Sequence, residues 1–494
     1  MIYSVATPEP VYDQLRRHLL RSDGQEDLAF ALWHPSRGAD RLTAVISEIV
    51  EPLQGEREVH GNAAFLPAYF ERALGRAVAD GASLAFMHSH PRGRGWQGVS
   101  PDDDAAERGH AGPVLGATAR PFVGLTMAGD GHLAARFWER TGRRTFDLRE
   151  AETVRIVGDH LRVFFNDRLR PAPETQATQA RSVSAWGPAA QALLSRLRVG
   201  VIGLGSVGSI VAEILARTGI SHIRLMDFDS LEEVNLDRTL GATLRDVALA
   251  RSKVEVAARS IRSSATASPV RIDPLELSVV EEEGLRSALD CDVLFSCVDR
   301  PWPRAVLNLL AYAHAIPVVD GGIVVRTRAG QRMLGAEWRA HIAAPGRRCL
   351  ECLGQYDPGH VSAEREGYFD RPSYLVGLPA GHAIRRNENV FMFGAAAASL
   401  EALQFLSLVV SPGGVSNVGA QMQHITTGRI DLDDAKCEAG CPYSSPGFSS
   451  RADDLDLEVT GRHDAADHAR AARGARQREP RIRFQRFVER LLGQ

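Results

Sequence analysis

The order of hydrophobic and polar positions predicts alternating strands and helices through most of the chain. In the first 165 residues, the apolar runs LAFALW (28–33) and SLAFMHSH (83–90) predict strands. Between them, LPAYFERALGRAVADG (66–81) has apolar residues at helical spacing and ends at a glycine, which predicts an amphipathic helix. From residue 198 to about 340, strand and helix patterns alternate regularly. This alternation is typical of a doubly wound parallel sheet, so the expected fold class is α/β.

Shifts in composition predict two domains. The stretch PAPETQATQA (171–180) has no apolar face, and we place a linker there. The expected parts are a first domain over 1–165, a linker over 166–180, a second domain over 181–445, and a polar, charged tail over 446–494. The last stretch, RIRFQRFVERLLGQ (481–494), predicts a short amphipathic helix; we favour packing on the core, with docking of a partner as the alternative.

Bulk composition narrows the class of protein. The 494 residues are 44% hydrophobic and 24% charged, with a formal net charge of −3, so nothing global points to nucleic acid or an acidic membrane surface. The N-terminal sequence lacks the basic start and apolar run of a signal peptide. The longest apolar run, 389–410, is interrupted by Glu401 and Gln404, which favours a buried helix over a membrane span. We therefore expect a cytoplasmic protein.

The segment around MHSHPRGRGWQGVSPDDD (87–104) predicts a metal site. Because alternate residues of a strand share a face, His88 and His90 can reach one ion. Ser100 and Pro101 are typical of an N-cap and a first helical residue. A helix that begins beside the histidines can bring Asp103 in as a third ligand. Three protein ligands and a water are the pattern of a catalytic zinc.

A carboxylate is the usual general base at such a site. Glu26 directly precedes an apolar strand, whereas Glu48 and Glu51 are weaker candidates. This series resembles the JAMM/JAB metalloprotease family, whose pattern is an upstream Glu, then His-x-His-Pro, then Ser-x-x-Asp. The resemblance covers residues 10–140. It implies zinc ligands at His88, His90 and Asp103, a base at Glu26 and an oxyanion stabiliser at Ser100.

Nine residues separate His90 from Ser100, where the commonest family pattern has seven, so Asp102 and Asp104 remain alternatives to Asp103. Known family members cleave isopeptide or peptide bonds after the C-terminal glycine of ubiquitin-like proteins. The resemblance therefore implies a metallopeptidase; a metal-free domain retained for structure is the alternative.

A second site begins at GLGSVG (203–208), which fits the Gly-x-Gly-x-x-Gly turn. Glycines at Gly203, Gly205 and Gly208 let phosphates approach the backbone at a helix N-terminus. Asp227 ends the next predicted strand, where an acid meets a ribose hydroxyl. Both features fit a nicotinamide dehydrogenase as well as an ATP-dependent enzyme.

The motifs that follow separate these two classes. Three further motifs follow along the chain, in the order DFDSLEEVNLDRTL, RSKVEVAARSI and DVLFSCVDRPWPR. The series, over residues 181–441, resembles the ThiF/MoeB adenylyltransferases and the related ubiquitin-activating enzymes. It implies a Rossmann-like ThiF-type domain that uses ATP and magnesium. The implied roles are ribose binding for Asp227, phosphate binding for Asn235, Arg238 and Lys253, magnesium binding for Asp299, and contact with the phosphates of the neighbouring subunit for Arg181.

That last role implies a homodimer formed through the second domain. In the family, an Asn usually follows the magnesium-binding Asp, but here Arg300 does. In the implied reaction, a terminal carboxylate attacks the α-phosphate of ATP and pyrophosphate leaves. Arg238, Lys253 and the magnesium ion at Asp299 would neutralise the charge that builds on the phosphates.

The positions of the cysteines predict a second zinc site and bear on whether the chain forms a thioester. Cys349, Cys352, Cys437 and Cys441 supply four thiolates, enough for a tetrahedral structural zinc, with a redox pair as the alternative. Thioester-forming members of the family carry a cysteine after the first pair, and none lies between Cys352 and Cys437. Buried, inert side chains are expected at Cys291 and Cys297. The adenylating domain is therefore expected to stop at the acyl-adenylate or to transfer it to an external nucleophile, with a thioester on a noncanonical cysteine as the less favoured alternative.

The two resemblances together imply one shared substrate, a small ubiquitin-like or sulfur-carrier protein with a C-terminal glycine. The first domain would trim or release its C-terminus, and the second would adenylate the exposed carboxylate. A bacterial ubiquitin-like conjugation pathway, phage defence and sulfur-carrier activation all fit. The alternatives are modification and cleavage of a short peptide in a small-molecule pathway, and a non-catalytic scaffold that binds ubiquitin-like tails.

Overall fold

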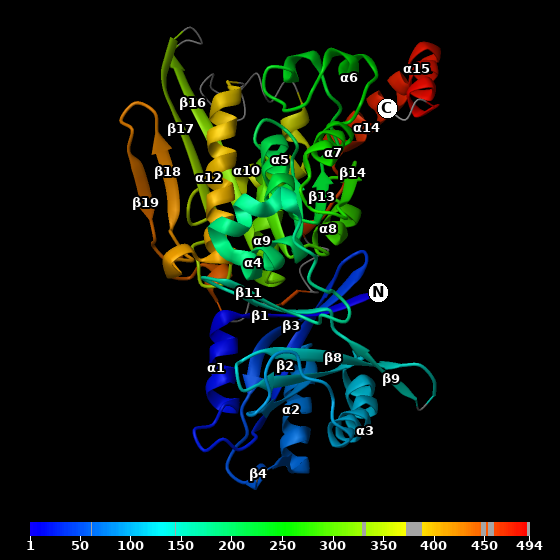
Figure 1. The fold of residues 1–494 in the computed structure, drawn as a ribbon, viewed down its shortest axis with the longest axis vertical. Coiled ribbons are helices and arrows are strands. Elements are labelled where there is room, and N and C mark those ends of the chain that lie inside the picture. The colour runs from blue at the N-terminus through cyan, green and yellow to red at the C-terminus, as the bar shows by residue number, and fades with distance from the viewer. Residues whose placement is uncertain are drawn as a thin grey trace. The chain divides into compact units, whose positions relative to one another are not determined.

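The computed structural model describes residues 1–60, 62–143, 145–328, 332–371, 388–445, 451–452 and 459–491. The chain divides into two compact units. The first comprises Met1–Pro171, Tyr312–Ala315 and Gly440–Leu455, and the second comprises Ala172–Ala311, Ile316–Ala439 and Asp456–Gln494. Each unit is built around one large sheet flanked by helices, so each has an α/β architecture (Figure 1).

The first unit contains a nine-stranded mixed sheet in the order β11-β10-β1-β3-β2-β6-β7-β8-β9. Its strands are β1 (Ile2–Pro8), β2 (Leu28–Arg37), β3 (Arg41–Val50), β6 (Ser83–His90), β7 (Phe122–Ala128), β8 (Leu133–Arg140), β9 (Phe146–Glu150), β10 (Thr153–Val157) and β11 (Leu161–Phe165). A separate hairpin joins β4 (Arg57–His60) to β5 (Asn62–Phe65). The strands predicted at 28–33 and 83–90 are confirmed as β2 and β6.

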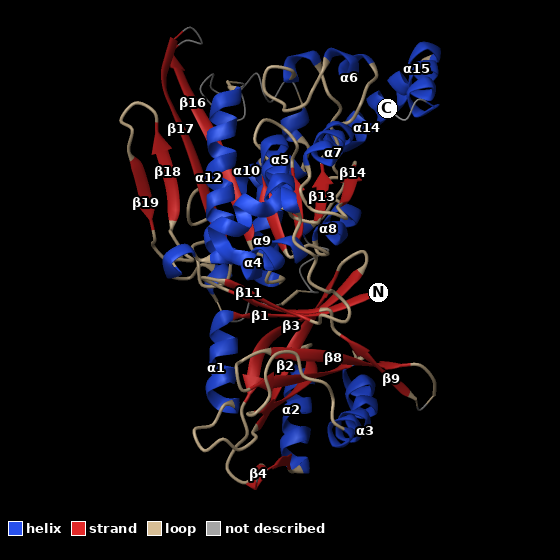
Figure 2. Cartoon of the chain, in the orientation of Figure 1, coloured by secondary structure: helices blue, strands red, loops and turns tan. Residues whose placement is uncertain are grey.

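Helices cover both faces of this sheet (Figure 2). They are α1 (Glu9–Leu19), α2 (Pro67–Ala79) and α3 (Pro101–Thr118). Because alternate strand residues point to opposite faces, Ala29, Ala31 and Trp33 of β2 share a buried cluster with α1. The residues between them share a second cluster with α2 and α3: Leu28, Phe30 and Leu32. The helix predicted over 66–81 is confirmed as α2.

The second unit contains an eight-stranded sheet in the order β14-β13-β12-β15-β16-β17-β18-β19. Its strands are β12 (Arg198–Ile202), β13 (His222–Met226), β14 (Arg271–Leu275), β15 (Val293–Ser296), β16 (Val318–Arg328), β17 (Arg332–Ala343), β18 (Ala420–His424) and β19 (Ile430–Asp433). The first five pair in parallel and the last three extend the sheet antiparallel. With β12 counted first, the parallel order is 3-2-1-4-5, which confirms the predicted doubly wound arrangement.

The α-helices of the second unit are α4 (Ala180–Arg196), α5 (Gly208–Thr218), α6 (Leu244–Ala248), α7 (Lys253–Ser264), α8 (Glu282–Ala288), α9 (Pro301–Ala313), α10 (Pro358–Arg365), α12 (Phe391–Val410), α14 (Asp464–Gln477) and α15 (Pro480–Leu491). Its short 3₁₀ turns are η1 (Ala177–Gln179), η2 (Glu233–Asn235), η3 (Tyr368–Asp370) and η5 (Pro412–Gly414), whereas η6 (Pro442–Ser444) belongs to the first unit. The end of the expected linker is therefore helical, because η1 and the start of α4 fall within it.

Two predictions about helices can be compared with the structure. By length and composition α12 could cross a membrane, but it packs against β16, β17 and α5 with Glu401 and Gln404 buried, as the interrupted apolar run predicts. The predicted C-terminal amphipathic helix is α15, and Ile482 and Glu489 on it are buried. Helix α14 was not predicted from the sequence.

Candidate active sites

The first candidate site lies at the end of β6. Strands β2 and β6 run antiparallel, with Leu28 opposite His88. The backbone N–H of Ser89 donates to the carbonyl of Asp27 over 3.0 Å, so this pairing continues beyond Leu28. Glu26 therefore lies across from His90. Its carboxylate adds to the rise in the pKa of His90, for which the hydrogen bond to Asp103 is the larger cause.

His88, His90 and Asp103 form a triangle with the dimensions of a zinc site. The two Nε2 atoms are 3.3 Å apart, Nε2 of His88 is 3.4 Å from Oδ1 of Asp103, and Nε2 of His90 is 3.7 Å from Oδ2. Ligand atoms at about 2.0–2.1 Å from a tetrahedral zinc are about 3.3–3.4 Å apart. The residues present thus fit the metal that the sequence implies.

Local sequence explains how Asp103 comes to this place. Ser100 caps α3, accepting from the backbone N–H of Asp103 over 3.1 Å and donating to its Oδ2 over 2.7 Å. Pro101 is the first residue of the helix, as predicted. Burial raises the pKa of the Asp103 carboxyl, but the two histidines and Ser100 outweigh it, so the pKa lies far below its usual range. Of the three candidate aspartates, the structure brings this one to the histidines; Asp104 pairs with Arg108.

The carboxylates considered for the base also differ in their surroundings. Glu48 lies 3.1 Å from Arg76 and Glu51 accepts from Gln14, so both belong to other surface contacts. Beside Glu26, the buried carboxylate of Asp27 pairs with Arg57 over 2.9 Å and accepts from the backbone N–H of Leu28. The contact with β6 comes from Ser89: the backbone N–H of Asp27 donates to its Oγ over 3.0 Å, which holds the start of β2, next to Glu26, against β6.

A buried network behind His88 was not predicted from the sequence. Thr126 Oγ1 lies 3.4 Å from Nε2 of His88 and accepts from Arg136 over 2.8 Å. The guanidinium of Arg136 is in turn paired with Glu107, whose Oε2 also accepts from Trp138 over 2.7 Å. These residues come from α3, β7 and β8, so no local motif marks them.

The second candidate site begins at the glycine turn between β12 and α5. Gly203 has a φ of +90°, and a Cβ there would lie 2.5 Å from the carbonyl oxygen of Cys297. A Cβ on Gly208 would lie 1.8 Å from the carbonyl oxygen of Gly203, so both positions require glycine. A Cβ on Gly205 would meet nothing within 4 Å. Its backbone is therefore open to a phosphate at the N-terminus of α5.

Asp227 and Lys253 meet at the carboxyl end of β13. Oδ2 of Asp227 accepts from the backbone N–H of Leu204, and Oδ1 accepts from that of Asp229 over 2.8 Å. Nζ of Lys253, at the first position of α7, lies 2.6 Å from Asp229 and 4.0 Å from Asp227. Burial lowers the pKa of Lys253, but the two carboxylates outweigh it and raise the pKa above its ordinary value. This cation is thus held charged beside the glycine turn.

Of the other residues predicted for this site, only some have a described interaction with Lys253. Asp299 follows β15, is exposed, and adds to the rise in the Lys253 pKa, which places it on the same edge of the sheet. Asn235 accepts from the backbone N–H of Glu232, and Arg238 donates to the carbonyl of Val234. Arg181 is exposed near the start of α4 and makes no described contact with these residues.

Four cysteines form a second metal-binding geometry. The sulfur atoms of Cys349, Cys352, Cys437 and Cys441 all lie within 4.8 Å of one another. The backbone N–H of Cys352 approaches Sγ of Cys349 at 3.3 Å, a contact that stabilises a thiolate. Zn–S bonds of about 2.3 Å put tetrahedral sulfurs about 3.8 Å apart, so the cluster is consistent with structural zinc.

Both remaining cysteines were expected to be buried and inert, but Cys297 is only half-buried. Cys291 is buried. Burial and the neighbouring Glu401 raise the pKa of Cys297, whose Sγ is 3.6 Å from Oε2 of that residue. A thiol with a raised pKa is a poor nucleophile.

Comparison with known proteins places the second unit in a family. The model of the ThiF family matches residues 177–438. The chain is 29% identical over 168 residues to the sulfur carrier protein ThiS adenylyltransferase of Bacillus subtilis, covering 34% of this chain and 46% of that protein. It is 29% identical over 168 residues to the molybdopterin-synthase adenylyltransferase of Escherichia coli, covering 33% and 61%.

It is also 31% identical over 137 residues to ubiquitin-like modifier-activating enzyme 5 of Drosophila virilis, covering 25% and 33%. The chain thus spans between a third and three fifths of the length of these relatives. Among solved structures, E. coli MccB in complex with MccA-N7isoASN aligns at 19% identity with a TM-score of 0.44, covering 54% of this chain and 75% of that one. More than half of the chain matches the family model, and the chain therefore belongs to the ThiF family.

Proposed function

We propose that the second unit adenylates the C-terminal carboxylate of a ubiquitin-like or sulfur-carrier protein. The observation that carries this proposal is the joining of Asp227 and Lys253 at the glycine turn, within the region that matches the ThiF family. Relatives named as adenylyltransferases of a sulfur carrier protein or as activating enzymes of a ubiquitin-like modifier support the substrate class.

In the proposed reaction, an oxygen of the substrate carboxylate attacks the α-phosphorus of ATP. The bond from that phosphorus to the oxygen it shares with the β-phosphate breaks, and pyrophosphate leaves. Lys253 and Arg238 offset the charge on the phosphates, and the open backbone at Gly205 lets them approach α5. Magnesium, when bound at Asp299, would supply further charge neutralisation. The raised pKa of Cys297 favours transfer of the adenylate to an external nucleophile over a thioester on this chain.

We further propose that the first unit is a zinc-dependent peptidase that cleaves after the C-terminal glycine of the same substrate. His88, His90 and Asp103 would hold the ion, which supplies a bound water of lowered pKa. Glu26, placed across from His90, accepts the proton of the attacking water and delivers it to the leaving amine. Ser100, fixed at the start of α3, donates to the oxyanion that forms on the scissile carbonyl.

ATP–pyrophosphate exchange with a ubiquitin-like partner ending in glycine tests both proposals. The partner is supplied in its mature form and with a few extra C-terminal residues. We expect exchange with the mature form in all cases, and with the extended form only when Glu26 is intact. Exchange with neither form would overturn the proposed substrate class. Exchange with a short free peptide instead would move the function to peptide modification, and zinc and ATP binding without either reaction would indicate a scaffold.

A further inference from the structure

The C-terminal helices α14 and α15 lie beyond the part of the chain that matches the ThiF family. They belong to the second unit, together with the residues of the nucleotide site. Helix α14 buries only two residues, Ala466 and Arg473. A guanidinium that is 5% exposed needs hydrogen-bond partners, and those partners show what the helix holds.

Arg473 forms hydrogen bonds with the turn that follows the proposed ribose ligand. Its guanidinium donates to the carbonyl of Phe228 over 2.8 Å, to Oγ of Ser230 over 3.3 Å and to Oε2 of Glu276 over 2.6 Å. Phe228 is the residue directly after Asp227. The His463 ring also packs on the Phe228 ring in a T-shaped arrangement, with centroids 5.0 Å apart. Residues of the C-terminal segment therefore contact this turn through both its backbone and its side chain.

The same helices cap the end of α6. The last carbonyls of a helix have no partner within it. Here those of Val247, Leu249 and Ala250 accept hydrogen bonds from the C-terminal segment. The donors are Arg476 at 2.8 Å, Arg486 at 3.2 Å and Gln477 at 2.9 Å, respectively. Ala250 has a φ of +49°, a conformation that costs energy for a residue with a Cβ, so the turn into α7 depends on such outside support.

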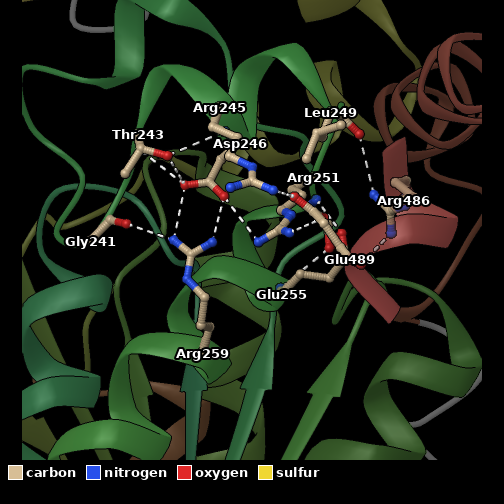
Figure 3. Close-up of polar contacts among 11 residues, drawn as sticks. Gly241, Thr243, Arg245, Asp246, Leu249, Arg251, Glu255, Arg259, Arg486 and Glu489 are labelled. Atoms are coloured by element: carbon tan, nitrogen blue, oxygen red, sulfur yellow. Dashed lines mark hydrogen bonds and ion pairs between the residues drawn. The ribbon is translucent and has the colours of Figure 1, made fainter. Parts of the chain in front are cut away.

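Ion pairs complete the attachment (Figure 3). Glu489 of α15 is 4% exposed and pairs with Arg251 and with Arg245, the latter over 2.7 Å. Arg486 pairs with Glu255 over 2.6 Å. Arg251 lies two residues before Lys253, the proposed phosphate ligand, and Glu255 two residues after it.

The two segments that the C-terminal helices contact, 228–231 and 249–253, are also hydrogen-bonded to each other. The backbone N–H of Leu231 donates to the carbonyl of Arg251 over 2.9 Å, and that of Lys253 donates to the carbonyl of Asp229 over 3.0 Å. These hydrogen bonds couple the segment that follows Asp227 to the segment that carries Lys253, so a displacement of one relative to the other would change the distance between the two side chains. Between them, the helices α14 and α15 contact both segments.

We propose that α14 and α15 form a clasp that positions the nucleotide site, with Arg473 and Glu489 as its positioning residues. The inference rests on the proposed adenylation and extends it: ATP binding requires a segment outside the family region. The clasp sets the spacing of the ribose and phosphate ligands. Its loss should weaken ATP binding and leave the affinity for the carboxylate substrate unchanged.

The test compares two variants, Arg473→Gln and Glu489→Gln, with a control. The control is Arg481→Gln, an arginine-to-glutamine change at an exposed position of α15. In full-length protein, we measure KM for ATP, KM for the carboxylate partner and kcat in pyrophosphate exchange. We expect KM for ATP to rise about tenfold in the first two variants, the size of a lost charged hydrogen bond. The other constants should stay within about twofold, and Arg473→Lys should recover part of the loss because it retains the charge but not the fork.

Parental KM values for ATP in both folded variants would overturn the clasp. If Arg473→Gln fails to fold, Arg476→Gln, which removes one hydrogen bond to Val247, decides the matter by the same constants. Hydrogen exchange of residues 228–231 and 249–253 gives a readout that needs no activity: faster exchange in Glu489→Gln than in Arg481→Gln is expected, and equal exchange contradicts the clasp. If the parent protein binds no ATP, the proposed adenylation is wrong, but the hydrogen-exchange measurement still tests the clasp.

Discussion

The backbone N–H of Leu204 donates a hydrogen bond to Oδ2 of Asp227 over 2.7 Å. This contact joins the glycine turn after β12 to the carboxyl end of β13, so the proposed ribose ligand also orders the phosphate turn. The other oxygen of the carboxylate accepts from Asp229, whose own carboxylate holds Lys253. One chain of contacts therefore fixes the groups that would bind ribose and phosphates.

Replacing Lys253 should abolish adenylation without unfolding the protein. The Lys253→Ala variant removes the cation that we propose binds the phosphates, and we expect pyrophosphate exchange to fall by about 100-fold or more. Lys436 is the only other lysine in the sequence, and its exposed side chain donates to the carbonyl of Gly346 over 2.8 Å. The Lys436→Ala variant should therefore retain parental exchange. Equal exchange in the two variants would exclude Lys253 from the ATP site.

The Glu26→Gln variant should separate peptide cleavage from zinc binding. The amide cannot accept the proton of the attacking water, so cleavage should fall by about 100-fold or more. Zinc content should match that of the parent because the three proposed ligands remain. Glu48→Gln is the matched control, since that carboxylate pairs with Arg76 at 47% exposure. If Glu26→Gln cleaves at the parental rate, the base must be sought elsewhere.

The cysteine cluster should account for one zinc per chain. In Cys352→Ser, we expect elemental analysis to show the loss of one equivalent and urea unfolding to show a loss of about 4 kcal/mol or more. Peptide cleavage by the first unit should persist. Cys291→Ala, which alters a buried cysteine outside the cluster, should keep the full zinc content. Unchanged zinc content in both variants would favour the redox alternative.

Sequence reasoning identified the features that local chemistry encodes. His88 and His90 share a strand face, and Ser100 and Asp103 form a capping box, so spacing predicted that this segment could form a site. The choice of Asp103 over Asp102 and Asp104 came from the structure. The role of Lys253 came from resemblance, because nothing in its neighbourhood marks a lysine as a phosphate ligand.

Features that depend on distant residues could not be predicted. Glu107 and Arg136 are 29 positions apart, and neither belongs to a motif. Helix α14 buries Ala466 and Arg473, seven positions apart, and these give no apolar period to detect. Its place in the fold depends on polar contacts with the turns after β13 and α6, which only the tertiary structure supplies.

The Glu107–Arg136 pair should be worth more to stability than an exposed pair on the same helix. The side chains are 0% and 2% exposed, and Glu107→Gln leaves the guanidinium buried without its partner charge. We expect the free energy of unfolding to fall by about 3–5 kcal/mol in urea titrations. Asp104→Asn breaks the exposed pair with Arg108 and should cost less than about 0.5 kcal/mol. Similar losses in the two variants would contradict the reading of the first as a buried ion pair.

The stabilisation that Asp246 gives the second unit should be lost in acid. It is 1% exposed, and although burial raises its pKa, hydrogen bonds from Arg259 and Thr243 outweigh this and lower the pKa below its ordinary value. A depressed pKa stabilises the fold above the unfolded value of about 3.9, and this contribution is lost as the pH falls through the folded value.

In Asp246→Asn, the charge that Arg259 and Arg251 face is gone at every pH. We therefore expect the variant to be less stable than the parent by about 3–5 kcal/mol near neutral pH, measured by urea unfolding. The gap should stay constant down to about pH 5 and shrink below about pH 4, where the parent carboxylate begins to protonate in the unfolded chain. A gap that stays constant to pH 2 would show that hydrogen bonding, which asparagine can partly replace, rather than charge, holds the start of α6 to α7.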